Sequence, residues 1–389
     1  MDVKLETPLP ALIPARFQTL LAACMTRDAS DLHLAPGQPP MLRQEGQLAA
    51  MEGEPTLATA DLTALITGLL AKGQIQILER RGDCDGAVTV NGTRFRYNVF
   101  KQSNGVCVAF RRLGEEFRGL RELGFPETLY QLCDLPNGLV LVAGPTGAGK
   151  STTLAALLDR INHSHPYHII TIEDPIEYVH VPVRGMVSQR QVGTDCSDFY
   201  EALVAALRED PDVIFVGEIR DLDTIRTAIT AAETGHLVFT TVHAGDCAGV
   251  IERLVSVFPA GEQDGMRRQL SFVLRAVITQ QLLICDGPRA TGRNGGSKRL
   301  SRVVASEVLM VNGAVANLIA TAKSSQIYSA MEVGGAQGMQ TLEQDLARLH
   351  VAGYISETTA LAFARSPRNL RDRVNHLRTG SHSAPLAHL

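Results

Sequence analysis

The stretch GPTGAGKST, residues 144–152, decides how this chain folds. It follows the apolar run LVLVA at 139–143, which is typical of a short buried strand. From Ser151 on, leucine and isoleucine recur at helical spacing, at positions 154, 157, 158 and 161, so a helix is predicted there. A strand, a glycine-rich turn and a helix in this order indicate a loop that holds phosphate groups.

The residue types of this loop suit a nucleoside triphosphate with Mg²⁺. Its glycines let the backbone turn tightly, so that successive N–H groups point at phosphate oxygens beside the positive end of the helix. Lys150 is expected to reach the β- and γ-phosphates, and the Ser151 hydroxyl to bind Mg²⁺. We assign phosphate contacts to the whole loop: Gly144, Pro145, Thr146, Gly147, Ala148, Gly149, Lys150, Ser151 and Thr152.

Composition bounds the class of protein. A chain of 389 residues, 45% of them hydrophobic, is expected to form two domains. Its 37 basic and 41 acidic residues give a net charge of −4, which argues against a protein that binds mainly by neutralising nucleic-acid phosphates. The N-terminus lacks the features of a signal peptide, and no apolar run is long enough for a membrane span. Seven cysteines without a C-x-x-C pair indicate neither a disulfide framework nor a zinc ribbon, so we expect a reduced, cytosolic chain.

The pattern along the chain predicts an α/β protein with two domains. Short strand patterns around one helical stretch predict a small α+β domain at 14–112, and a charged, glycine-punctuated linker follows at 113–120. From 121 to 370 helical patterns alternate with short apolar runs, which favours a mainly parallel sheet covered on both faces. The last residues, 371–389, are predicted to form a flexible tail. The basic, glycine-rich run at 286–302 is interpreted as a solvated hairpin tip, with contact to an anionic surface as the alternative.

Acidic residues follow two of the predicted strands, at the sheet edge where ligands of such sheets bind. The run 213–216 is followed by Gly217 and Glu218, whereas a Walker B segment usually ends in two acids. Glu218 is therefore free to polarise the attacking water or to hold the water shell of the metal. After the run 168–172 come Glu173, Asp174 and Glu177, which suit Mg²⁺–water ligation or general-base catalysis. Spacing does not separate these two roles, and one of the acids could instead cap the next helix.

Two histidines bound the predicted strand in HLVFTTVHA. His236 opens it and His243 closes it, which places His243 at the edge expected for the nucleotide. A lone histidine in such a place is more often a structural hydrogen-bonding group than a sensor of the γ-phosphate. The residues alone leave both roles open.

Four segments together resemble the secretion ATPases. GPTGAGKST, ITIEDPIEYVH, LREDPDVIFVGEIRDLDTI and TAAETGHLVFTTVHA are similar to the Walker A, Asp box, Walker B and His box of that family, in the same order. SDLHL, QPPMLR, RFRYNVF and GMQTLEQDL resemble the branch of type IV pilus retraction ATPases of the PilT/PilU kind. The related assembly ATPases carry a four-cysteine metal site and an extra N-terminal domain that are not found here. The resemblance covers about residues 14 to 370.

This resemblance implies a PAS-like N-terminal domain and a RecA-like ATPase domain with ATP and Mg²⁺ bound between them. It also implies a homo-hexameric ring at the cytoplasmic side of the cell membrane, with an inner-membrane platform protein and a paralogous pilus ATPase as partners and no nucleic acid. In that family the Asp-box and Walker B acids are catalytic, arginines neutralise the phosphates, and both histidines belong to the site. Carried over to this chain, the catalytic residues are Glu177, Glu218 and His243, the further nucleotide-binding residues are Arg96, Arg111, Arg208 and His236, and the metal-binding residues are Ser151, Glu173 and Glu218. For each arginine an ordinary surface ion pair is the simpler interpretation.

One departure bears on what the energy of ATP moves. The retraction motif AIRNLIRE reads AVANLIAT here at 314–321, so both arginines and the glutamate are absent. We expect an ATP-hydrolysing motor that drives pilus retraction and twitching motility. The alternatives are an accessory or assembly ATPase of a type IV pilus or type II secretion system, a nucleic-acid motor on the same core, and a ring component that binds ATP without hydrolysing it.

Overall fold

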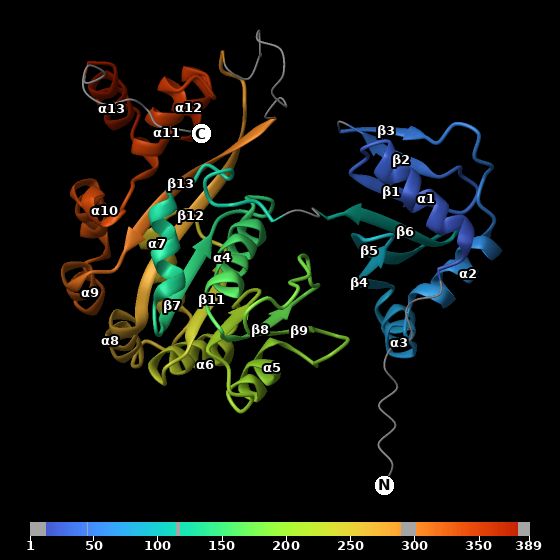
Figure 1. Cartoon of the computed structure of the whole chain (residues 1–389), viewed down its shortest axis with the longest axis horizontal. Coiled ribbons are helices and arrows are strands. Elements are labelled where there is room, and N and C mark those ends of the chain that lie inside the picture. The colour runs from blue at the N-terminus through green and yellow to red at the C-terminus, as the bar shows by residue number, and fades with distance from the viewer. Residues whose placement is uncertain (1–12, 45, 114–116, 289–300, 380–389) are drawn as a thin grey trace. The chain divides into compact units, whose positions relative to one another are not determined.

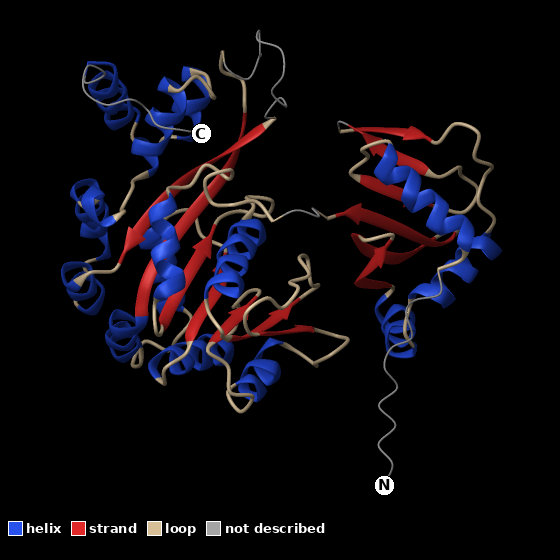
Figure 2. Cartoon of the chain, viewed as in Figure 1, coloured by secondary structure: helices blue, strands red, loops and turns tan. Residues whose placement is uncertain are grey.

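The computed structural model describes residues 13–44, 46–113, 117–288 and 301–379 (Figures 1 and 2). By its contacts the chain divides into two units. The first comprises Met1–Glu116 with the short segments Glu173–Val179 and Gln191–Asp195, and the second comprises the remaining residues. The division after Glu116 falls inside the segment 113–120 in which a linker was expected.

The first unit is built on a six-stranded sheet with the strand order β3-β2-β1-β6-β5-β4, in which all neighbouring strands are antiparallel. Along β5 every second side chain is buried, because one face of the sheet packs on the core and the other does not. Phe95 and Phe110 meet edge to face in that core, 6.5 Å between ring centroids. Its elements are α1 (Ala15–Thr26), β1 (Asp31–Leu34), β2 (Met41–Gln44), β3 (Gln47–Ala50), α2 (Thr59–Leu69), α3 (Lys72–Arg81), β4 (Asp83–Val90), β5 (Thr93–Gln102) and β6 (Gly105–Arg112).

The second unit is built on a seven-stranded sheet with the order β13-β12-β7-β11-β10-β8-β9. The five strands from β12 to β8 run parallel, and β13 adds an antiparallel edge. Strands β7, β10 and β11 are buried throughout, which explains why they appear in the sequence as unbroken apolar runs. The elements are η1 (Glu127–Asp134), β7 (Gly138–Ala143), α4 (Lys150–Ser164), β8 (His168–Glu173), β9 (Met186–Gln191), α5 (Phe199–Ala206), β10 (Val213–Val216), α6 (Leu222–Glu233), β11 (Leu237–Val242), α7 (Cys247–Ser256), α8 (Gln263–Val273), β12 (Leu274–Ile284) and β13 (Arg302–Met310).

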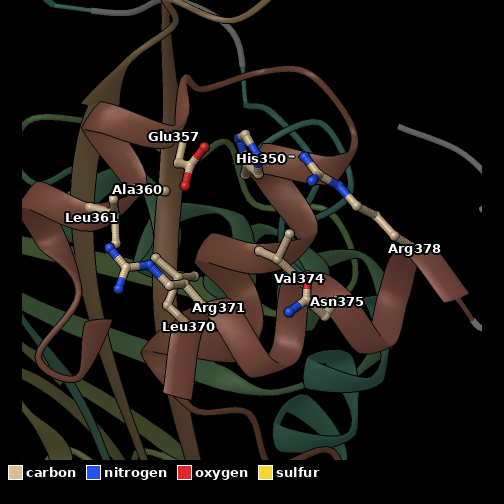
Figure 3. Close-up of a pocket in the computed structure, with 9 residues that line it drawn as sticks. All are labelled: His350, Glu357, Ala360, Leu361, Leu370, Arg371, Val374, Asn375 and Arg378. Carbon is tan, nitrogen blue, oxygen red and sulfur yellow. Dashed lines mark hydrogen bonds between the residues drawn. The ribbon is translucent and has the colours of Figure 1, made fainter. Parts of the chain in front are cut away.

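Helices complete the second unit after β13. They are α9 (Gly313–Ala320), η2 (Ser324–Gln326), α10 (Ile327–Val333), η3 (Gly335–Gln337), α11 (Leu342–Val351), α12 (Glu357–Phe363) and α13 (Pro367–Thr379). Helices α11 and α13 pack on each other and share an apolar cluster with β13. Between α11, α12 and α13 lies a pocket of about 170 Å³ (Figure 3). Its lining combines the apolar Ala360, Leu361, Leu370 and Val374 with the polar His350, Glu357, Arg371, Asn375 and Arg378.

The prediction of a flexible tail from residue 371 is corrected by α13. This helix continues to Thr379, because Leu370, Val374 and Leu377 contact the apolar cluster of α11 and β13. Helical order in so polar a segment comes from this packing and not from its own composition. Residues 380–389 lie outside the described part of the chain.

Most of the run at 286–302, predicted as a hairpin tip, also lies outside the described residues, which stop at 288 and resume at 301. Strands β12 and β13, which flank it, do form an antiparallel pair that ends with Ile284 opposite Arg302. The predicted fold class is confirmed: an α+β domain precedes an α/β domain with a mainly parallel sheet. Within the described ranges no helix combines the length and the apolar character that crossing a membrane requires.

Candidate functional site

The glycine-rich loop connects the end of β7 to the first turn of α4, as its sequence predicts. Gly147 and Gly149 have φ values of +79° and +88°, in the left-handed region that glycine tolerates. Gly144 has a φ of +148°, and a Cβ placed there would lie 2.3 Å from the backbone oxygen of Gln280. Only glycine fits position 144, since the loop passes so close to the neighbouring strand β12.

Gln280 on β12 holds this loop, although it was not among the predicted site residues. Its side chain is 1% exposed, and its Nε2 donates a hydrogen bond to the backbone oxygen of Ala148 at 2.7 Å. Strand β12 runs parallel to β7, with Thr279 opposite Ala143, so Gln280 stands where the loop begins. The sequence could have indicated Gln280 by the two glutamines inside the apolar run AVITQQLLI, because a polar side chain in a covered strand needs a hydrogen-bond partner.

Lys150 and Ser151 occupy the first turn of α4. The Lys150 Nζ donates hydrogen bonds to the backbone oxygens of Gly144 at 3.0 Å and Pro145 at 3.1 Å, so its ammonium lies across the start of the loop. Ser151 follows at the helix N-terminus, where free backbone N–H groups and the helix dipole favour an anion. The loop therefore gathers positive charge and donors at one point of the sheet edge.

Glu218 stands beyond the end of β10, which pairs with β11 and is separated by it from the loop's own strand β7. One of its carboxylate oxygens forms an ion pair with Arg220 Nη2 at 2.7 Å and lies 3.8 Å from His243 Nε2. The turn before it is fixed on both sides: Gly217 donates its N–H to Ile172 and accepts from the Thr241 hydroxyl at 2.6 Å. Arg220 and Thr241 were not predicted as site residues. Thr241 fixes the turn before Glu218, whereas the Arg220 side chain is 69% exposed and its pair with Glu218 is correspondingly weak.

His243 shares this edge, as its position at the end of the strand predicts. Burial lowers the pKa of His243 below its ordinary value of 6.5, and the positive charges of Lys150, Arg220 and Arg253 lower it further against the opposite effect of Glu218. The imidazole is therefore neutral at pH 7 and carries one donor and one acceptor nitrogen. Lys150, Glu218 and His243 are thus brought together.

His236 is not brought to the loop. It precedes β11, and its backbone oxygen accepts a hydrogen bond from the N–H of Gly138, the first residue of β7, at 3.1 Å. The phosphate loop follows the last residue of β7, at the other end of that strand. Six strand residues separate the two ends, roughly 20 Å at the usual rise. Its Nδ1 contacts the backbone oxygen of Ala231 at 2.9 Å, so in this unit the histidine makes a structural hydrogen bond at the opposite edge of the sheet.

Of the Asp-box acids, Glu173 is the last residue of β8 and the others follow it, and residues 173–179 group by their contacts with the first unit. Glu173 is 8% exposed, and one of its carboxylate oxygens lies 3.5 Å from the backbone nitrogen of Glu177. These two acids are local neighbours, and their catalytic and metal-binding roles stay predictions. Among the residues that can be placed, no three His, Cys, Asp or Glu side chains are grouped to hold a metal ion.

Two of the predicted arginines stand side by side in the first unit. Arg96 on β5 and Arg111 on β6 are opposite each other in register, and Asp31 on β1 is the next partner of Arg111. Burial raises the pKa of Asp31, but hydrogen bonds from Ser30 and from Arg111, whose Nε lies 2.8 Å away, outweigh it and lower that pKa. Arg96 lies 3.7 Å from Asp85, and its side chain and that of Arg111 are 42% and 69% exposed. Pairs this exposed are weak, so neither guanidinium is committed to its partner.

Arg208, the third predicted arginine, lies in the second unit after α5. It is exposed, and its backbone N–H donates to Ala205 at 2.9 Å as the helix ends. Its predicted contact with the nucleotide stays a prediction, as do those of Arg96 and Arg111.

Comparison with known proteins gives matches over most of the chain. The family model described as type II/IV secretion system protein matches residues 8–357. The chain is 45% identical over 351 residues to the type IV pilus retraction ATPase PilT of Pseudomonas aeruginosa, covering 90% of this chain and 98% of that protein. It is 35% identical over 356 residues to the type IV pilus ATPase PilU of the same organism, covering 91% and 90%. A crystal structure of the pilus retraction motor PilT with bound ADP matches with a TM-score of 0.82 at 42% identity, covering 91% of this chain and 98% of that one.

We expect Gln280→Leu to weaken nucleotide binding. The variant leaves the Ala148 oxygen buried without its donor, and such an orphaned acceptor costs about 1 to 3 kcal/mol, or roughly tenfold in affinity. The dissociation constant for a fluorescent ATP analogue measures this. Gln281→Leu on the same strand is the matched control, and wild-type affinity in Gln280→Leu would show that the loop does not need this bond.

The titration of His243 should respond in opposite directions to two substitutions. Lys150→Met removes a positive charge that disfavours the imidazolium and should raise the pKa of His243, whereas Glu218→Gln removes a negative charge and should lower it. NMR titration of the imidazole C–H signals measures both shifts. A wild-type midpoint at or above 6.5, or two shifts of the same sign, would contradict the geometry described for this edge.

Proposed function

The chain belongs to the type II/IV secretion system protein family, and we propose that it is the ATP-hydrolysing motor that drives retraction of a type IV pilus. One observation carries the proposal: Lys150 of the phosphate loop, Glu218 and a neutral His243 share one edge of a parallel sheet. The relatives compared above are named as a pilus retraction ATPase and a pilus ATPase, and the chain covers nine-tenths or more of their length. The chain is therefore an ATPase, and pilus retraction is the work that we assign to it.

The residues present fit ATP with Mg²⁺. Three positive-φ glycines give the loop the inward-facing N–H groups that phosphate oxygens need, and Lys150 supplies the charge for the β- and γ-phosphates. We propose that the Ser151 hydroxyl and, through water, Glu173 and Glu218 hold the Mg²⁺. Few protein ligands suffice, because Mg²⁺ keeps waters and is bound largely by phosphates in such sites. When bound, the ion neutralises charge that develops on the transferring phosphoryl group.

In the proposed mechanism Glu218 polarises the attacking water. Arg220 faces one carboxylate oxygen of Glu218, and the other oxygen is proposed to accept a proton from water. His243, neutral and 3.8 Å from the same carboxylate oxygen, can donate to or accept from the γ-phosphate region without adding a buried charge. Glu177 is the alternative base, and Arg96, Arg111 and Arg208 are proposed to neutralise the phosphates because their exposed guanidiniums suit that role.

The assembly is proposed by analogy with these relatives. It is a homo-hexamer that acts at the cytoplasmic side of the cell membrane on an inner-membrane platform protein, alongside a paralogous pilus ATPase. ATP binding and hydrolysis would change how the two units of each chain close on each other and so move the partner. Nucleic acid is not part of this proposal.

A second candidate, an accessory pilus motor, is favoured by helix α9. Where the retraction motif carries two arginines and a glutamate, this helix and its end carry Ala316, Ala320 and Thr321. Thr321 is exposed and the two alanines are half-buried, so the outer side of α9 lacks the charges of the motif. If those charges couple hydrolysis to retraction, this chain splits ATP and contributes to retraction only beside another motor.

Glu218→Ala should retain ATP binding and lose turnover by about 100-fold or more, which is the usual cost of removing a general base. Lys150→Ala should instead weaken nucleotide binding itself by roughly tenfold or more, because it removes charged hydrogen bonds to phosphate. Phosphate release and analogue binding, measured on both purified variants, separate the two effects. Wild-type turnover in Glu218→Ala would sink the catalytic assignment.

Deletion of the gene tests the work that the motor performs. A retraction motor predicts cells with excess surface pili and no twitching, and an accessory motor predicts ordinary pilus numbers with weakened twitching. Pilus counts by electron microscopy, with complementation by the wild type and by Glu218→Ala, measure this. Bald cells would contradict both candidates and indicate an assembly ATPase.

A further inference from the structure

The loop that follows His243 is tied to a distant part of the chain. Residues 243–246 connect β11 to α7, and the backbone oxygen of Gly245 accepts a hydrogen bond from Arg365 Nη2 at 2.9 Å. Arg365 lies between α12 and α13, 120 residues further along the chain. At its other end the loop is fixed by Asp246, which caps α7 through the N–H of Gly249. The loop that follows His243 is thus held by hydrogen bonds at Gly245 and at Asp246.

The guanidinium of Arg365 is itself anchored by a buried carboxylate. The same Nη2 that bonds Gly245 also donates to Glu307 on β13, whose side chain is 2% exposed. Thr279, opposite Glu307 on β12, donates its hydroxyl to the same carboxylate oxygen at 3.4 Å. Thr279 in turn pairs with Ala143, the last residue before the phosphate loop. One nitrogen of Arg365 therefore joins the loop after His243 to the strands that border the phosphate loop.

The backbone around Arg365 is held by a second buried acid. The N–H groups of Arg365 and Ser366 donate to one oxygen of Glu343 on α11 at 2.9 and 3.0 Å, and the Tyr328 hydroxyl donates to the other at 2.7 Å. Glu343 is 1% exposed. Because both the backbone and the guanidinium of Arg365 are fixed by hydrogen bonds, the side chain is held in one conformation, unlike a mobile surface arginine.

Satisfying Glu307 does not by itself require the bond to Gly245. A buried carboxylate needs a paired, hydrogen-bonded cation, and burial raises the pKa of Glu307 although Arg365 opposes this. The guanidinium could meet that need from other orientations with its remaining donors. In the observed orientation it also clamps the Gly245 oxygen, and this is what links the ion pair to the site.

We propose that Arg365 is a positioning residue for ATP hydrolysis: by clamping Gly245 against Glu307 it holds the His243 imidazole beside Glu218. This inference rests on the proposed function of the site, in which His243 contributes to turnover. It assigns Arg365 no contact with the nucleotide, so its loss should reduce turnover and leave nucleotide affinity unchanged.

The test uses a variant that removes the Arg365 side chain without leaving a buried charge. Arg365→Met alone strands the Glu307 carboxylate and can prevent folding, so the informative variant is Arg365→Met combined with Glu307→Gln. Glu307→Gln alone keeps the bond to Gly245 and serves as its reference. Arg373→Met on α13, which removes an exposed pair with Glu332 at 3.4 Å, controls for loss of an arginine in these helices.

We expect the double variant to show a kcat lower than that of Glu307→Gln on the order of tenfold, the scale of a misplaced site group, with unchanged affinity for an ATP analogue. Hydrogen exchange in a peptide spanning 243–249 should become faster. In a His243→Ala background the double substitution should cause no further loss of turnover, because the group that it positions is gone.

Three outcomes would overturn the inference. The first is a kcat in the double variant equal to that of Glu307→Gln, and the second is an equal loss in the His243→Ala background, which would indicate a merely structural role. The third is full turnover in His243→Ala itself, which removes the group that Arg365 is said to position. None of these bears on whether the protein hydrolyses ATP, since Glu218→Ala decides that separately.

Discussion

The parallel pairing of β7 with β11 on one side and β12 on the other is the constraint on which the rest of the site depends. Because the three strands run in the same direction, the segments that follow β7 and β11 leave the sheet at the same edge. The phosphate loop and His243 meet for this reason, and Glu218 joins them from β10, the next strand of the sheet. Moving any one of these strands by one residue would turn its terminal side chain to the other face.

The strands also keep the polar groups of the edge in place, and to do so they bury polar side chains. Gln280 and Glu307 are almost fully buried, yet each reaches a backbone oxygen or a cation that belongs to the site or borders it. The Gln280 Nε2 and the Glu307 carboxylate are hydrogen-bonded, whereas the Gln280 Oε1 is buried without a partner among the described residues. The bonds that are made stiffen the strands around the site. The same edge carries an exposed arginine, Arg220, paired with the Glu218 carboxylate, so one partner of this acid is open to solvent.

Local features of this fold could be read from the sequence, and long-range contacts could not. The strand, turn and helix around the loop follow from residues within one short window, and so do the ends of β10 and β11 that carry Glu218 and His243. Gln280 and Arg365 were missed because their partners lie 132 and 120 residues away, and no periodicity reports such a pair. His236 was placed with the nucleotide by resemblance, although the strand that it opens already put it at the far edge. The tail was mistaken because α13 depends on contacts of Leu370, Val374 and Leu377 with α11 and β13, which composition does not reveal.

Strand β13 is synthesised after the residues of the site that it supports. It covers the outer edge of β12 and brings Glu307 with it, and both arrive only after the phosphate loop, Glu218 and His243 have been made. A nascent chain that ends before Arg302 exposes the backbone donors and acceptors of β12. Such an exposed edge can pair with another chain. The residues of the phosphate loop, Glu218 and His243 are therefore synthesised before β13 and Arg365, the segments that contact β12 and the loop after His243 in the folded chain.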